Sequence, residues 1–197
     1  MEINAKQVKE LRDRTGAGMM DCKKALTETN GDIEKATNWL REKGIAKAVS
    51  KSDRDTKEGR IYSYIHTNNK IGVLVEINCE TDFVARTENF ESLCKDIAMH
   101  IAATAPLAIR PEDLDPKLIE NEREVYRNKA INDGKPEQVV DKIVEGQVQK
   151  LYKDNCLLQQ EFVKDPNKTV QDVIASAIAT IGENIQIARF TRYFLGE

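Results

Sequence analysis

Apolar residues recur at helical spacing in three short segments at the start of the chain. Such a stripe lies on one face of a helix. The three stripes are Ala5, Val8 and Leu11, then Cys22, Ala25 and Leu26, then Ile33, Ala36, Trp39 and Leu40. Asn4 and Gln7 are spaced to form a capping box before the first stripe, and Gly44 is predicted to end the third helix. Residues 1–45 therefore predict a small three-helix module.

Positions 46–59 lack the helical pattern of the preceding segments. They are rich in charged residues and show no apolar periodicity. A segment of this kind has no face to bury against a core. We therefore predict a flexible linker over 46–59 and a boundary between two domains.

The apolar pattern changes to a period of two from Arg60 onward, which is typical of strands. Two such runs, 61–66 and 71–77, flank the polar stretch 67–70 and predict a hairpin. A helix is expected next, from about Phe83 to Thr104. Its core face would carry Phe90, Leu93, Cys94, Ile97, Ala98 and Ile101.

The second half of the chain predicts a helical hairpin and a closing strand. Prolines at 106, 111 and 116 indicate an extended connector. Two charged helical segments, joined by a glycine–proline turn at 134–136, predict a projecting hairpin over about 118–153. A last helix begins at Thr169 and ends at Gly182, and 185–195 then alternates as a strand. Residues 60–197 thus predict an α+β domain, with helices packed on a three-stranded antiparallel sheet.

The composition argues against several classes of function. The chain has 30 Lys and Arg against 33 Asp and Glu, a net charge of −3, which argues against a dedicated nucleic-acid binder. Its four cysteines lack C-x-x-C spacing and it has 2 histidines, so we expect no metal and no cofactor. No leader peptide or span of roughly 20 apolar residues is visible, so we expect a cytoplasmic protein that meets no membrane. No catalytic motif is present, and we predict that it is not an enzyme.

The most informative stretch is NCETDFVAR at 78–86, which follows the second predicted strand and opens a predicted helix. It places the acid Asp82 beside the aromatic Phe83 at a helix start. Such a pair suits insertion into a partner protein. The alternative is structural: Asp82 would cap the helix, and Phe83, seven residues before Phe90, would join its core face.

Several long motifs, in order, carry a family resemblance. They are VKELR at 8–12, TGAGMMDCKKAL at 15–26, the stretch 78–86, IAMHIAA at 97–103 and FTRYFLGE at 190–197. They are spread from one end of the chain to the other, and the match extends over essentially the whole chain, which resembles bacterial elongation factor Ts.

That resemblance implies a guanine-nucleotide exchange factor for elongation factor Tu. It further implies that the factor dislodges Mg²⁺ from Tu, speeds GDP release and GTP loading, and stays on aminoacyl-tRNA·Tu·GTP until GTP hydrolysis. The residues implied for dislodging Mg²⁺ are Thr81, Asp82, Phe83 and Val84. Other contacts with Tu are implied for Arg12, Met19, Met20 and His100. The N-terminal module is expected to resemble ubiquitin-associated (UBA) domains.

For the other contact residues, ordinary structural roles stay open. Arg12 could be a solvated helix charge, Met19 and Met20 could fill gaps in a core, and His100 could be a satisfied core histidine. Two rival functions also remain: a UBA-type scaffold for another protein, and an RNA-binding accessory protein. The acidic balance speaks against the second.

One departure concerns assembly. Many members of the family carry the strand–helix core unit twice, whereas this chain shows one copy, which holds both the Asp82–Phe83 and the His100 motifs. It resembles the short form, in which two chains pair to rebuild the larger core. We therefore predict a homodimer. From the charge balance, we also expect no direct contact with nucleic acid.

Overall fold

A computed structural model describes residues 3–196; Met1, Glu2 and Glu197, at the ends of the predicted ranges 1–45 and 60–197, lie outside it. The N-terminal part forms α1 (Ala5–Thr15), α2 (Met19–Glu28) and the start of α3 (Ile33–Val49). The predicted capping box between Asn4 and Gln7 is present. The predicted stripes, except for Ala5, which is exposed, pack together around Leu11, Cys22, Ala25, Leu26 and Ala36, which are fully buried.

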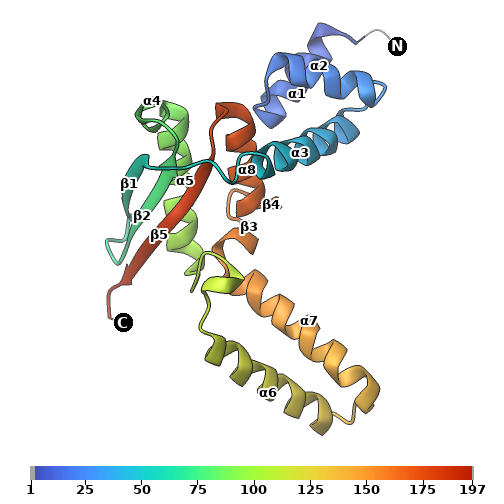
Figure 1. The fold of residues 1–197 in the computed structure, drawn as a ribbon, viewed down its shortest axis with the longest axis vertical. Coiled ribbons are helices and arrows are strands. Elements are labelled where there is room, and N and C mark those ends of the chain that lie inside the picture. Colours follow the sequence, from blue (N-terminus) through green and yellow to red (C-terminus); the bar gives the residue numbers. More distant parts are fainter. Residues whose placement is uncertain (1–2, 197) are drawn as a thin grey trace.

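The predicted end of the third helix is wrong. Helix α3 continues through Gly44 to Val49, so residues 46–49 belong to a helix and not to a flexible linker. Gly44 is buried against α8 (Val170–Ile181), where a Cβ would lie 3.7 Å from the Cβ of Ala179. Packing against α8 outweighs the roughly 1 kcal/mol that a glycine costs inside a helix. Figure 1 shows α3 running from the N-terminal helices to α8.

The predicted α+β core is confirmed. Strands β1 (Glu58–Ile65), β2 (Ile71–Cys79) and β5 (Ile185–Phe194) form an antiparallel sheet in the order β1-β2-β5. Strand β1 starts inside the predicted linker, at Glu58. The buried face of the sheet carries Val73, Val75, Ile77 and Cys79, and α5 (Glu88–Thr104) and α8 cover it.

The predicted helix from Phe83 to Thr104 is in fact two helices. A four-residue helix, α4 (Asp82–Ala85), is followed by α5 from Glu88. Thr87 separates them because its hydroxyl accepts the N–H of Phe90 and so caps a new helix start. The predicted core face of α5 is confirmed, since all six predicted residues are buried.

Two lobes project from this core, as Figure 1 shows: the N-terminal helices and a helical hairpin. The helical hairpin is α6 (Pro116–Asn132) and α7 (Glu137–Asn155), reached through η1 (Pro111–Asp113), and it has its own apolar seam. The accessible surface is 12615 Å² for 22.3 kDa, about a third more than the roughly 9,400 Å² expected of a compact monomer. The projecting helices account for an outline that is lobed and not spherical.

After α7 the chain forms features that the pattern did not predict. These are η2 (Leu157–Gln159) and a small hairpin of β3 (Glu161–Phe162) and β4 (Asp165–Thr169). The predicted start of the last helix at Thr169 is confirmed: Thr169 is the N-cap of α8, and Gly182 ends that helix with φ of 94°. Across residues 3–196, none of the helices has the length and apolar character to cross a membrane. The division into 1–45, 46–59 and 60–197, and the likeness to UBA domains, stay predictions.

Candidate functional site

The acid and the aromatic of the 78–86 stretch lie together in the first turn of α4; we call Thr81–Val84, its N-cap and first three residues, the tip. Thr81 is the N-cap, and its hydroxyl accepts the N–H of Val84 at 3.4 Å. Phe83 is 82% exposed, so it does not belong to the core face of α5. Asp82 is not the cap; it lies in the first turn, 2.9 Å from Arg86. The tip therefore presents a ring and a carboxylate to solvent.

An exposed phenylalanine of this kind is informative. Aromatic side chains are among the largest apolar groups, and burying one stabilises a protein by about 1.5–3 kcal/mol. The neighbouring positions Ala85 and Phe90 are buried and anchor α4 and α5 to the sheet. Phe83 is thus turned away from a core that lies close by, which is what a partner-binding side chain requires.

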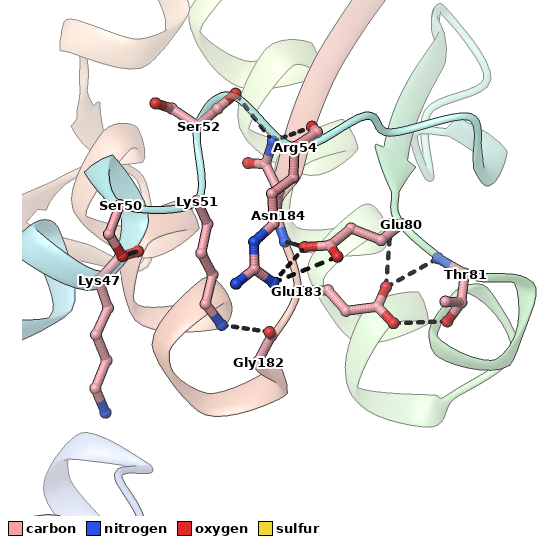
Figure 2. Close-up of polar contacts among 10 residues, drawn as sticks. All are labelled: Lys47, Ser50, Lys51, Ser52, Arg54, Glu80, Thr81, Gly182, Glu183 and Asn184. Carbon is pink, nitrogen blue, oxygen red and sulfur yellow. Dashed lines mark hydrogen bonds and ion pairs between the residues drawn. The ribbon is translucent and has the colours of Figure 1, made fainter.

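The backbone that leads into the tip is held by residues that follow α8, as Figure 2 shows. Both carboxylate oxygens of Glu183 accept hydrogen bonds from this segment: Oε2 from the backbone N–H groups of Glu80 and Thr81, and Oε1 from the side-chain hydroxyl of Thr81. Glu80 in turn accepts the N–H of Asn184 at 2.6 Å and pairs with Arg54 at 3.3 Å. The bond from Asn184, followed by the charge of Arg54, lowers the pKa of Glu80 below its usual value.

No pattern in the sequence singles out Glu183 or Asn184. They lie about a hundred residues from the tip along the chain, so no local period connects them with it. One sequence signal was available: Glu183 is an acid placed directly after a helix-ending glycine. Helix C-termini favour positive charge, so an acid there calls for a reason.

The other predicted contact residues of the N-terminal helices are also exposed. Met19 and Met20 begin α2 and are 60% and 76% exposed, so neither fills the core. Arg12 lies on the solvent side of α1. Helices α1 and α2 therefore expose a positive charge and two soft apolar side chains, at a place separate from α4 (Figure 1).

His100 lies elsewhere: it is fully buried in α5. Its Nδ1 accepts the N–H of Val163 at 3.2 Å, so the neutral ring carries its proton on Nε2 and donates to Oε1 of Gln160 at 3.0 Å. Burial lowers the pKa of His100 below its usual value, partly opposed by the bond to Gln160. In this structure it has the role of a satisfied core histidine, which leaves its imidazole out of a partner's direct reach.

The cysteines and the possible metal ligands are the other side chains that could carry chemistry. All four cysteines are free and buried. Burial raises the pKa of Cys79 to about 11, of Cys94 to about 12 and of Cys156 to about 11, so their thiols stay protonated near neutral pH. Across residues 3–196, no group of three or more His, Cys, Asp or Glu side chains is arranged to hold a metal ion. The tip and the exposed methionines are the candidate contact residues that the structure places at the surface.

Comparison with known proteins agrees with this interpretation. The family model described as "Elongation factor TS" matches residues 4–197. An elongation factor Ts of Geotalea daltonii is 60% identical over 197 residues, which are 100% of this chain and 91% of the relative. One of Geobacter metallireducens is also 60% identical, with the same coverage. One of Fervidobacterium nodosum is 58% identical and is covered over 100% of both chains. The chain belongs to the elongation factor Ts family.

Proposed function

We propose that this protein is the guanine-nucleotide exchange factor of elongation factor Tu and works by inserting its tip into the nucleotide-binding domain of Tu. The observation that carries the proposal is the 82% exposure of Phe83 beside Asp82. Membership of the family supports the partner and the role in translation elongation. We propose further that the protein performs this role in the cytoplasm and transforms no substrate itself.

The energy for exchange comes from binding. A nucleotide held at nanomolar affinity is bound by about 12 kcal/mol, much of it through phosphate-binding amides and Mg²⁺. A 10⁴-fold faster release requires a relative destabilisation of roughly 5.5 kcal/mol. Phe83 supplies apolar burial and displaces neighbouring groups of Tu, while the carboxylate of Asp82 disturbs the polar network that holds Mg²⁺. Thr81 and Val84 complete the inserted turn.

Thermodynamic linkage sets the rest of the cycle. A factor that weakens GDP binding is itself bound more weakly when GDP is present. GTP then refills the emptied site, and its excess over GDP gives the cycle its direction. We propose that the factor lingers on Tu carrying GTP and aminoacyl-tRNA until hydrolysis.

A second contact comes from the N-terminal helices. Arg12, Met19 and Met20 dock on the same domain of Tu, which adds affinity without entering the nucleotide site. Because His100 is buried, it contributes indirectly, by holding Val163 and the β3–β4 hairpin in place. Val163 itself is exposed and is available to a partner.

The direct test is the release of fluorescent GDP from Tu. The protein, added in increasing amounts in the presence of excess unlabelled GDP, should accelerate the fluorescence decay to a saturating rate. An unchanged decay at concentrations where the two proteins bind each other would refute the exchange function. Free Mg²⁺ should slow the stimulated rate, because it competes with the displaced state.

We also propose that the chain forms a homodimer through the uncovered face of its sheet. The register places Ile61, Ile65, Leu74 and Tyr193 on the face opposite to the core, and all four are exposed. A second copy of the same face would cover them, as in a β-sandwich. Sedimentation at micromolar concentration should give a dimer, and Leu74→Lys should shift it to monomer. A monodisperse wild-type monomer would contradict this proposal.

A further inference from the structure

The C-terminal end of α8 has an unusual charge arrangement. Gly182 ends the helix, no basic residue lies in the last turn, and Glu183 follows. An acid near the negative end of a helix dipole is unfavourable by a few tenths of a kcal/mol or more. Lys51, from the segment after α3, donates to the carbonyl oxygen of Gly182 and supplies the missing positive charge. Since the helix dipole disfavours an acid at this position, we look for the role of Glu183 in its contacts with another element.

That element is the entrance to the tip. The carboxylate of Glu183 accepts from the N–H of Glu80 at 3.1 Å, from the N–H of Thr81 at 3.0 Å and from the hydroxyl of Thr81 at 2.6 Å. Figure 2 shows these three contacts converging on one half-buried side chain. Since the N–H of Val84 donates to the same hydroxyl, Glu183 also orients the group that caps α4.

Asn184, the next residue, donates a hydrogen bond to the segment from which Glu183 accepts. The N–H of Asn184 donates to Glu80 at 2.6 Å, so the two chain segments exchange hydrogen bonds. The side chain of Asn184 donates to the carbonyl oxygens of Ser52 at 3.2 Å and Arg54 at 2.9 Å. Residues 182–184 thus form a junction between the segment after α3 and the start of the tip (Figure 2).

We propose that Glu183 is a positioning residue for exchange: it holds the backbone at residues 80–81 so that Phe83 and Asp82 are presented in the inserting geometry before Tu is met. This inference rests on the proposed function. A helix of four residues is too short to hold itself in place in water. Without the carboxylate, the N–H groups and the hydroxyl of Thr81 turn to water, and the tip must be ordered during binding. Ordering at that moment costs binding energy that is otherwise used to displace the nucleotide.

The test compares Glu183→Ala and Glu183→Gln with two control variants, Asp55→Ala and Asp55→Asn. Asp55 is an exposed acid of the segment between α3 and β1, and its ion-pair partner is Lys57 of that same segment. We expect Glu183→Ala to lower the saturating rate of GDP release on the order of tenfold, with the half-saturating concentration changed less than about twofold. Glu183→Gln should recover most of the rate, because its amide oxygen accepts from the two N–H groups. Both control variants should retain the wild-type rate.

Hydrogen exchange of the free protein provides a readout that does not depend on Tu. In Glu183→Ala the amides of residues 80–84 should exchange faster, while those of α5 and the sheet keep their protection. If the Glu183→Ala variant keeps the wild-type protection of residues 80–84, or the wild-type saturating rate of GDP release, the inference is overturned. If wild-type protein fails to accelerate GDP release at all, the proposed function fails, and the exchange of residues 80–84 alone then decides whether Glu183 holds the tip.

Discussion

Replacing Phe83 by alanine removes the ring of the tip and little else. The side chain is 82% exposed in the free protein, and α4 is capped by Thr81 whether or not the ring is present. Surface truncations of this kind change the free energy of unfolding by about 0.5 kcal/mol or less. The variant should therefore fold normally, and its effect should be confined to the encounter with Tu.

The size of that effect follows from the burial that the ring can still gain. Full burial of a phenylalanine side chain contributes about 1.5–3 kcal/mol. Since 82% of Phe83 is exposed, insertion can add about 1.2–2.5 kcal/mol. If this energy is used to destabilise bound nucleotide, its loss slows stimulated GDP release by about 7- to 60-fold, at about 1.4 kcal/mol for each factor of ten.

Stopped-flow release of fluorescent GDP from Tu, with the factor titrated to saturation, separates the two parameters that matter. The saturating rate should fall by this factor, while the half-saturating concentration changes less. Leu107→Ala is the matched control, because Leu107 is also an exposed apolar residue (64%) but follows the far end of α5. A variant that binds Tu and retains the wild-type saturating rate would refute the insertion mechanism. A loss confined to affinity would make Phe83 a docking residue only.

Three further predictions concern docking, stability and pH. Joint replacement of Met19 and Met20 by alanine should raise the half-saturating concentration with little effect on the saturating rate; unchanged affinity would remove them from the interface. Gly44→Ala should stabilise the protein by about 0.5–1 kcal/mol in urea denaturation, because the new Cβ makes an ordinary 3.7 Å contact with Ala179; a loss of stability would mean that α3 and α8 cannot accommodate it. Burial lowers the pKa of His100, so below about pH 6.5 the unfolded chain binds a proton that the folded protein resists. Stability should therefore fall as pH drops from about 6.5, by up to about 1.4 kcal/mol per pH unit, and His100→Gln should remove this component; an identical pH profile in the variant would contradict it.

The elements that local pattern predicted are those whose cause is local. Stripes of apolar residues identified the helices at the N-terminus, α5 and α8, because one face of each is buried. The capping box of Asn4 and Gln7 was visible for the same reason: the interacting groups are three residues apart. The pattern failed where the partner is distant or the element is short. Gly44 does not end α3 because α8 packs against it, and β3 has only two residues, too few for a period.

The sequence by itself determined the family, the α+β class and the stretch that holds the acid beside the aromatic. Only the tertiary structure decided which of these side chains can meet a partner. The sequence left both Phe83 and His100 open to a core or a contact role, yet one is 82% exposed and the other is fully buried. The structure alone also revealed the support of the tip, because Glu183 and Thr81 are separated by 102 positions. Periodicity reports which face of an element is buried; contacts between distant residues exist only once the chain has folded.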